Sequence, residues 1–388
     1  MRLSSTVVKS MDNEQSAMGG ADGQGAGSTD QTTGETLDQS AGQTTNQTAG
    51  IVTIAVDAMS GDLGAATAVD AAKSITRKHD DLRILLVGKE SELSPLLGQH
   101  SGRISIHHAS EVVMMEDAPA QALRSKKDSS MRVAINLVKA GDAAACVSCG
   151  NTGALMAMGR FVLKMLPGID RPAIIAAIPN LGGHVQMLDL GANVDCSAEH
   201  LYQFAVMGSA LSSAVDGIEK PKVGLLNIGS EDIKGNELVQ CADKLLEQAR
   251  ANNQLNYVGF IEGDQIYMGD ADVIVADGFA GNVALKSSEG VARLIRSYLK
   301  QEFTRSPLSK VMGLIAAPVL KQLGKRIDPR RYNGASLLGL RGIVIKSHGS
   351  ADALALENAL SIARLEAKKN LISLINTQTE TRLIQSSA

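Results

Sequence analysis

The sequence predicts an α/β protein with a mostly parallel sheet and helices on both faces, a three-layer α/β/α sandwich. Strand and helix patterns alternate from residue 51 to about residue 300, which is typical of parallel strands joined by crossover helices. The strands are continuous apolar runs, as expected where helices cover both faces of a sheet. The chain has 388 residues, 44% of them hydrophobic, which is ample for a buried core.

The elements follow in a regular order. A β-branched strand at 51–56 ends at Asp57, a second strand is expected at 83–88, and apolar spacing predicts a helix over 131–139. A helix over about 351–374 closes the fold. Further short apolar runs are read as strands, and each ends at a polar loop: 143–147, 223–226, 273–276 and 342–345.

The two ends of the chain differ from the body. Residues 12–50 consist mostly of Gln, Thr, Gly, Ser, Ala and Asp, which cannot bury enough surface to offset their ordering entropy. We expect a disordered tail at 1–50, a folded domain at 51–376 and a flexible end at 377–388. No stretch approaches the ~20 apolar residues of a membrane span. Since the start also lacks a signal-peptide pattern, a cytoplasmic location is expected.

The segment 298–330 departs from the alternating pattern. Its apolar residues have helical spacing, interrupted at Pro318. We expect an amphipathic helical hairpin that packs on the body or on a second subunit, or that touches an anionic membrane. The packing role and the membrane role are compatible if the hairpin has a packed base and an apolar tip that projects from it. The segment is rich in basic residues: Arg305, Lys310, Lys321, Lys325, Arg326, Arg330 and Arg331.

Composition and motifs exclude several classes of function. A net charge of −3 and the absence of Trp argue against nucleic-acid binding. The spacing Cys146-x-x-Cys149 lacks a second pair to complete a zinc site, so reduced thiols are expected. No phosphate-binding GxxxxGK[ST] motif and no convincing GxGxxG are present, which disfavours nucleotide hydrolysis and dinucleotide binding. The sequence has no recognisable Ser-His-Asp or Cys-His order, so a covalent acyl-enzyme is not expected.

Glycine- and asparagine-rich loops after predicted strands are the main functional signal; they lie at 148–154, 189–193, 227–235 and 277–283. Backbone N–H groups at helix starts bind anions, and ligands of open α/β sheets lie outside the carboxyl ends of strands. The pattern predicts a site for a small, highly charged substrate, although each loop alone also fits a turn or helix cap. The candidate binding residues are Asp57, Gly61, Asp62, Ser148, Gly150, Asn151, Thr152, Gly153, Asp189, Gly278 and Asn282.

Two further groups have both a structural and a functional interpretation. Arg124, Lys126 and Lys127 precede a helix, and form either a solvated basic turn or a surface for an acidic partner. His348 follows the strand at 342–345. Its ring can donate to a developing oxyanion or shuttle a proton, and a histidine anchored by neighbouring backbone fits equally well.

Taken together, these segments resemble the PlsX-type phosphate acyltransferases of bacterial phospholipid synthesis, over about residues 51–376. Two residues depart from the family pattern, which usually has glycine at Ser60 and a small residue, commonly alanine, at Cys149. Since glycine there can have a positive φ, Ser60 raises a question about the local backbone. The matching motifs include Leu123-Arg124-Ser125-Lys126-Lys127-Asp128, Ser148-Cys149-Gly150-Asn151-Thr152-Gly153-Ala154, Asp189-Leu190-Gly191-Ala192-Asn193, Asp277-Gly278-Phe279 and Lys346-Ser347-His348-Gly349-Ser350.

The resemblance implies a reaction without metal or cofactor. Acyl-(acyl carrier protein) and inorganic phosphate give acyl phosphate and the free carrier protein. The resemblance also implies a fold akin to phosphotransacetylases and the isocitrate dehydrogenase group, a homodimer, and peripheral association with the inner membrane face. The product then feeds a glycerol-3-phosphate acyltransferase.

The resemblance also suggests individual roles. Phosphate must be desolvated, held and aimed at the thioester carbonyl, for which Asn151, Thr152 and Lys234 are candidates beside the glycine-loop N–H groups. Arg124, Lys126 and Lys127 would meet the acidic carrier protein. The alternatives are a phosphotransacetylase for short acyl-CoA and a non-catalytic membrane scaffold. The candidate oxyanion donors are Asn193, Asn227, Asn282 and His348.

Overall fold

The computed structural model describes residues 50–99, 102–326 and 328–383, which belong to one compact unit that begins at Asn46. The predicted disordered tail, apart from Gly50, lies outside the described residues, as does the end of the chain at 384–388.

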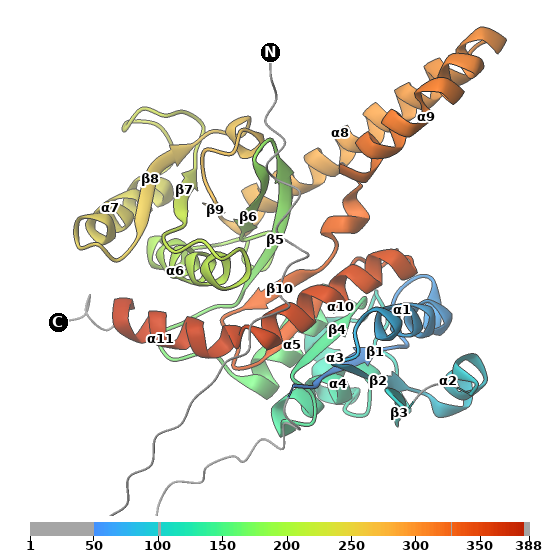
Figure 1. The fold of residues 1–388 in the computed structure, drawn as a ribbon. Coiled ribbons are helices and arrows are strands. Elements are labelled where there is room, and N and C mark those ends of the chain that lie inside the picture. Colours follow the sequence, from blue (N-terminus) through green and yellow to red (C-terminus); the bar gives the residue numbers. More distant parts are fainter. Residues whose placement is uncertain (1–49, 100–101, 327, 384–388) are drawn as a thin grey trace, which may run out of the picture. The chain divides into compact units, whose positions relative to one another are not determined.

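The described strands form one mixed sheet (Figure 1). They are β1 (Val52–Asp57), β2 (Leu82–Gly88), β3 (Ile104–His108), β4 (Ala145–Ser148), β5 (Ala173–Asn180), β6 (Gly183–Leu188), β7 (Lys222–Leu226), β8 (Asn256–Ile261), β9 (Val273–Val275), β10 (Ala335–Leu338) and β11 (Ile343–Lys346). Their order across the sheet is β3-β2-β1-β4-β11-β10-β5-β6-β9-β7-β8.

The sheet reverses direction in its middle. The pairs β11–β10, β10–β5 and β5–β6 are antiparallel, and all other neighbouring pairs are parallel. As a result, β6, β9, β7 and β8 run opposite to β1, β2, β3, β4 and β11. Loops that follow these two sets of strands therefore lie at opposite edges of the sheet.

Helices cover both faces, which confirms the predicted sandwich. Ile54 and Val56 of β1 pack with helices α1 and α10, whereas Ala55 between them packs with α4 and α5 on the other face. Helices α6, α7 and α11 cover the second half of the sheet. The helices are α1 (Gly64–Lys78), α2 (Glu90–Leu97), α3 (Pro119–Ser125), α4 (Ser130–Ala140), α5 (Thr152–Leu163), α6 (Ala198–Val215), α7 (Glu237–Ala251), α8 (Gly278–Thr304), α9 (Pro307–Arg326), α10 (Ala353–Lys368), α11 (Leu371–Leu383), and two short 3-10 helices, η1 (Gln265–Tyr267) and η2 (Pro329–Tyr332).

The end of the chain is more ordered than the sequence predicted. The single closing helix expected over 351–374 is two helices, α10 and α11, and the second continues to Leu383. Residues 377–383 are thus helical rather than flexible. The reason is tertiary packing, because Leu371 and Ile375 are buried in the core beneath α6.

Helices α8 and α9 form a hairpin that projects from the body of this unit (Figure 1). The hairpin begins at Gly278, earlier than the predicted 298, and α9 continues through Pro318. A proline inside a helix frees the carbonyl four residues earlier, and Leu314 is exposed, so water can satisfy that carbonyl. None of the described helices combines the length and the apolar character needed to cross a membrane.

Candidate active site at the ends of β1, β4 and β11

Three polar residues end three adjacent parallel strands in one row. Asp57 of β1 is in register with Ser148 of β4, and Ser148 is in register with Lys346 of β11. Residues in register point to the same face of a sheet. The Ser148 Oγ donates a hydrogen bond of 2.6 Å to the Asp57 Oδ2, in agreement with this placement. A carboxylate, a hydroxyl and an ammonium group therefore meet at one edge.

Asp57 is almost completely buried, at 2% exposure. Burial raises the pKa of its carboxyl group, and hydrogen bonds from Ser148 and Ser60 oppose that shift. The buried Ser130 hydroxyl also lies near this carboxyl and lowers its pKa, although no hydrogen bond of normal geometry reaches the second oxygen, Oδ1, within the described chain. An unpaired buried carboxylate oxygen is costly, which makes Asp57 a candidate for a functional group rather than an ordinary helix cap.

The two residues that depart from the family pattern contact each other. The Cys149 backbone N–H donates to the Ser60 Oγ at 3.2 Å. Ser60 does not have a positive φ, so the serine is not strained; the adjacent Gly61 has the positive φ, +94°. A Cβ on Gly61 would lie 2.9 Å from the Cys149 Cβ. Serine at position 60 and cysteine at position 149 are therefore compatible with the loop, and the position that requires glycine is Gly61.

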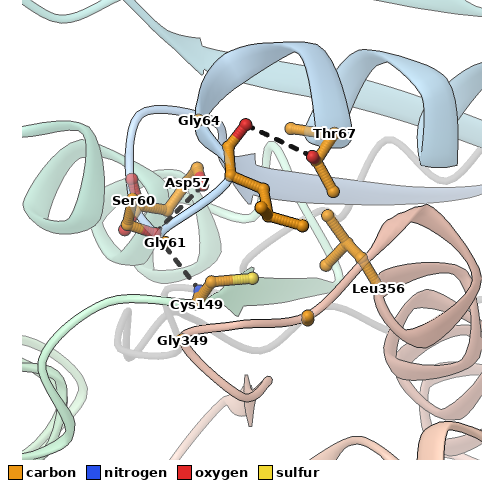
Figure 2. Close-up of a pocket in the computed structure, with 11 residues that line it drawn as sticks. Asp57, Ser60, Gly61, Gly64, Thr67, Cys149, Gly349 and Leu356 are labelled. Carbon is orange, nitrogen blue, oxygen red and sulfur yellow. Dashed lines mark hydrogen bonds between the residues drawn. The ribbon is translucent and has the colours of Figure 1, made fainter.

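A small cavity lies beside this cluster (Figure 2). Asp57, Ser60, Gly61, Cys149 and Gly349 are among its lining residues. Its volume of about 10 Å³ is close to the space of one water molecule. The cavity is thus too small for a phosphate ion or an acyl chain, and a substrate has to bind on the open side of the edge.

The loop 148–154 leads into the start of α5. The Asn151 Oδ1 accepts from the Ala154 backbone N–H at 3.0 Å, and its amide nitrogen donates to the carbonyls of Met115 and Asp117. Asn151 is therefore the helix cap, and its side chain is already occupied. The N–H groups of Thr152 and Gly153 have no acceptor within the described part of the chain. They offer the free helix N-terminus that binds anions.

Lys346 is the functional candidate that the sequence analysis missed. Its ammonium lies 3.5 Å from the Cys149 carbonyl oxygen and also contacts the Ser347 carbonyl. Burial lowers the pKa of this ammonium, and the nearby Cys149 and Asp57 act in the opposite direction. The available signal was its place as the last residue of an apolar strand, whereas its register with Ser148 is visible only in the structure.

His348 stands beside Lys346 with one ring nitrogen available. Its Nδ1 accepts from the Ser350 backbone N–H at 3.2 Å, which places the proton of the neutral ring on Nε2. Partial burial lowers the pKa of the imidazole, and the charge of Lys286 adds to this effect. The ring is therefore a neutral donor through Nε2 at physiological pH. The nearby Asp62 carboxylate is exposed and makes no side-chain hydrogen bond or ion pair within the described chain.

The loop 189–193 lies at the opposite edge, and its polar groups are used internally. The Asp189 carboxylate accepts from the backbone N–H groups of Ile174, Ala192 and Asn193. The Asn193 amide donates to the Pro172 carbonyl at 2.7 Å and to Asp189. Asp189 is fully buried, which raises the pKa of its carboxyl against these hydrogen bonds. Both residues hold the loop in place.

The remaining candidates at this edge also shape loops. The Asn227 side chain donates to the Lys234 carbonyl and accepts from the Ile228 N–H. Lys234 itself is exposed. Gly278 lies against Asn193, where a Cβ would be 2.5 Å from the Asn193 carbonyl oxygen, and Asn282 packs on Gly191. Helix α8 extends from this edge toward the edge that carries Lys346 and His348, since the charge of Lys286 on α8 acts on His348.

The three basic residues before α4 differ in their surroundings. Lys126 pairs with Asp117 and donates to the Val112 carbonyl at 2.8 Å, so it fastens the segment that Asn151 also contacts. Arg124 and Lys127 are exposed and form no ion pair with any described residue. Only the latter two are available to an outside partner.

Comparison with known proteins agrees with this fold and shows the family. A family model described as "Fatty acid synthesis protein" matches residues 52–374. A phosphate acyltransferase of Methylococcus capsulatus is 60% identical over 323 residues, which cover 82% of this chain and 94% of that protein. One from Nitrosococcus oceani is 57% identical over 333 residues, 85% of this chain and 97% of its own.

Solved structures share the architecture at low identity. A phosphotransacetylase from Streptococcus pyogenes superposes with a TM-score of 0.57 at 18% identity, over 82% of this chain and 94% of that one. The sandwich, with a free helix N-terminus and a half-buried lysine at one sheet edge, is the architecture of an enzyme-like α/β protein with a candidate anion-binding site. The chain belongs to the fatty acid synthesis protein family of PlsX-type phosphate acyltransferases, which makes it an acyltransferase.

Proposed function

We propose that this chain transfers the acyl group of a long-chain acyl-(acyl carrier protein) to inorganic phosphate. The phosphate oxygen attacks the thioester carbonyl, a C–O bond forms and the C–S bond breaks. The products are acyl phosphate and the carrier thiol, which takes the proton of hydrogen phosphate. The names of the relatives support the reaction class, and the row of Asp57, Ser148 and Lys346 at the start of α5 is the observation that carries it.

In this proposal, phosphate binds at the start of α5. The free N–H groups of Thr152 and Gly153 and the Lys346 ammonium attract an anion from two sides. Asp57 partly neutralises the half-buried Lys346 and orients Ser148. Since hydrogen phosphate is already a nucleophile at neutral pH, holding and aiming it is most of the catalytic work.

His348 is the proposed oxyanion donor. Its Nε2–H is the free donor of a neutral ring beside Lys346. A donor of this kind is typically worth about 3 kcal/mol of transition-state stabilisation. Asn193 and Asn227 take a supporting role in this proposal, because their amide groups already bond to backbone atoms of their own loops.

The α8–α9 hairpin supports two further parts of the proposal, a homodimer and peripheral contact with an anionic membrane. Large apolar side chains are exposed along both helices, including Leu294, Tyr298, Leu308 and Ile315. Surfaces of this kind mark protein or membrane contacts. The acyl phosphate would then pass to a membrane-bound glycerol-3-phosphate acyltransferase in phosphatidic acid synthesis.

The test is phosphate-dependent release of free thiol from palmitoyl-(acyl carrier protein) by the full-length chain, with hydroxylamine to trap acyl phosphate. We expect both signals, and both should vanish without phosphate. Parallel reactions with short acyl-CoA decide the alternative donor. Turnover of acyl-CoA alone would replace the proposal by a phosphotransacetylase, and no turnover by a folded protein would favour a scaffold.

A further inference from the structure

A groove of about 540 Å³ lies on the surface formed by α3 and α5, away from the sheet edge that carries the candidate site. All of its lining side chains are apolar or cationic: Leu123, Ala157, Arg160, Phe161, Lys164 and Met165. The side chain of Phe161, one of these residues, is 54% exposed, which is unusual for a large aromatic side chain. No acidic residue lines the groove, so its charge is of one sign.

Two cations flank the exposed aromatic ring. The Arg132 Cζ of α4 lies 5.0 Å from the centroid of the Phe161 ring, and the Lys164 Nζ lies 5.1 Å from it. Both distances are within the range of cation–π contacts. The Arg132 Nη1 is buried and has no hydrogen-bond partner in the described chain.

The backbone at the end of α5 is strained. Lys164 has φ 67° and ψ 170°, a backbone conformation that residues other than glycine rarely adopt. The Lys164 carbonyl accepts from the Arg341 backbone N–H, and the Arg341 Nε donates to the Met165 carbonyl. These contacts hold the strained residue, and Lys164 remains over the groove. Strain that is fixed in this way is common at binding sites.

The groove is connected to the candidate site through α5. This helix begins at Thr152, whose N–H faces the proposed phosphate, and Phe161 lies nine residues further on, about 14 Å along the axis. Helix α3 packs beside α5, and Pro119 at its start lies against Gly153. The exposed and unpaired Arg124 and Lys127 extend the cationic surface at the end of α3.

We propose that this groove docks the acyl carrier protein, through an acidic face that presents carboxylates to Arg160 and Lys164 and an apolar side chain to Phe161. The inference depends on the proposed function, because it names the docking surface for that substrate. Charge complementarity favours an acidic protein, since both charged residues that line the groove, Arg160 and Lys164, are cationic. An exposed aromatic ring between cations resembles the centre of many protein interfaces. Docking here leaves the carrier's flexible phosphopantetheine arm free to follow α5 to the site.

The test measures acyl phosphate formation and direct binding by the full-length chain. In the variant Arg160→Glu with Lys164→Glu, we expect KM for palmitoyl-(acyl carrier protein) to rise at least about tenfold, with kcat nearly unchanged. Turnover of palmitoyl-pantetheine, which has no carrier protein, should stay at the wild-type value. The salt dependence of KM should also become weaker, because two screened charges are lost.

The matched control is Lys244→Glu with Lys369→Glu, an exposed lysine on α7 and one directly after α10, with the same change in charge. This control should keep the wild-type KM for the carrier. Phe161→Ala should weaken carrier binding in titration calorimetry without changing the net charge. Equal KM values for the groove variant and the wild type, with both folded by circular dichroism, would overturn the inference.

Two other outcomes are separable. If the wild type forms no acyl phosphate from any donor, the proposed reaction is wrong, and calorimetry with the carrier protein alone still tests the groove. If the groove variant loses binding to vesicles of anionic lipid but binds the carrier normally, the surface contacts a membrane and the inference is wrong.

Discussion

At the residue scale, the site depends on a lysine that looks ordinary in the sequence. A lysine at the end of a strand usually extends into solvent, but Lys346 is held between the Cys149 carbonyl and the charge of Asp57. Only the pairing of β11 with β4 brings it beside Ser148. The sequence analysis identified Asp57 and Ser148 at the ends of their strands, but in the segment 346–350 it selected His348 instead of Lys346.

The same limit applies to Asn193 and Asn227. Asparagine in a glycine-rich loop is equally consistent with a ligand contact and with a loop anchor. Their amide groups bond to the carbonyls of Pro172 and Lys234. The first of these partners is 21 residues away in the sequence, so no local pattern could reveal it. His348 has a free Nε2–H, and the Lys346 ammonium keeps one N–H beyond its two carbonyl contacts, so both are the better catalytic candidates.

Replacing Lys346 tests the proposed phosphate site. We expect Lys346→Met to lower kcat/KM for phosphate by about 10²–10³-fold, the loss typical of removing one preorganised charge donor. Lys346→Arg should restore part of it. Lys286→Met, which removes an exposed lysine nearby, should keep most of the activity. Steady-state kinetics with varied phosphate measure the effect, and wild-type values for Lys346→Met would exclude the lysine from the site.

Glu366 gives a prediction about stability and pH. It is 2% exposed on α10 and bonded to Ser336, and burial raises the pKa of its carboxyl to about 7. Because the folded-state pKa lies above the unfolded value, the stabilising contribution of Glu366 is complete below pH 4.5 and is lost as the pH rises through about 7. A shift of this size corresponds to roughly 3 kcal/mol.

Glu366→Gln removes this titration, because glutamine is neutral at every pH. The stability of the variant relative to the wild type should therefore increase from pH 5 to pH 8 in urea unfolding. Glu219→Gln, at an exposed position, is the control and should follow the wild type. If the free energies of unfolding of Glu366→Gln and the wild type change in parallel with pH, Glu366 does not titrate in this range.

At the scale of elements, the sequence predicted helix and strand types well but not where they end. Helix α4 was expected at 131–139 and occupies Ser130–Ala140, because apolar spacing and the Ser129 cap agree. The ends of α8 and α11 depend on tertiary contacts, so periodicity could not locate them. The reversal of the sheet is also set by tertiary pairing, since β10 inserts between β11 and β5 although it follows β9 in sequence.

The start of α8 provides a sharp test of element packing. A Cβ on Gly281 would lie 2.0 Å from the Asp189 carbonyl oxygen, a backbone atom that cannot yield. Gly281→Ala should therefore destabilise the fold by about 3 kcal/mol or more. Gly290→Ala in the same helix meets no atom within 4 Å and should stabilise by up to about 1 kcal/mol, since alanine favours helices. Thermal unfolding of both variants measures the difference, and similar melting temperatures would contradict this packing.

At the scale of the whole molecule, the hairpin is the least explained part of the described chain. We call the part of α8 with exposed Val291 and Leu294 the base of the hairpin. The tip is the part next to the turn, where Leu308 and Met312 of α9 are exposed. Basic residues such as Arg305 and Lys310 stand next to the turn. The base resembles an interface with a second copy, and an apolar tip with cations suits an anionic lipid surface.

These two roles predict opposite effects for two pairs of substitutions. Val291→Asp with Leu294→Asp should shift the protein from dimer to monomer in sedimentation velocity, because a buried charge in an interface is costly. Leu308→Asp with Met312→Asp should leave the dimer intact and abolish co-sedimentation with phosphatidylglycerol vesicles, since apolar burial and anionic attraction are both lost. Each pair is the control for the other. A tip variant that still binds vesicles would move the membrane contact elsewhere, and a base variant that remains dimeric would assign the dimer to another surface.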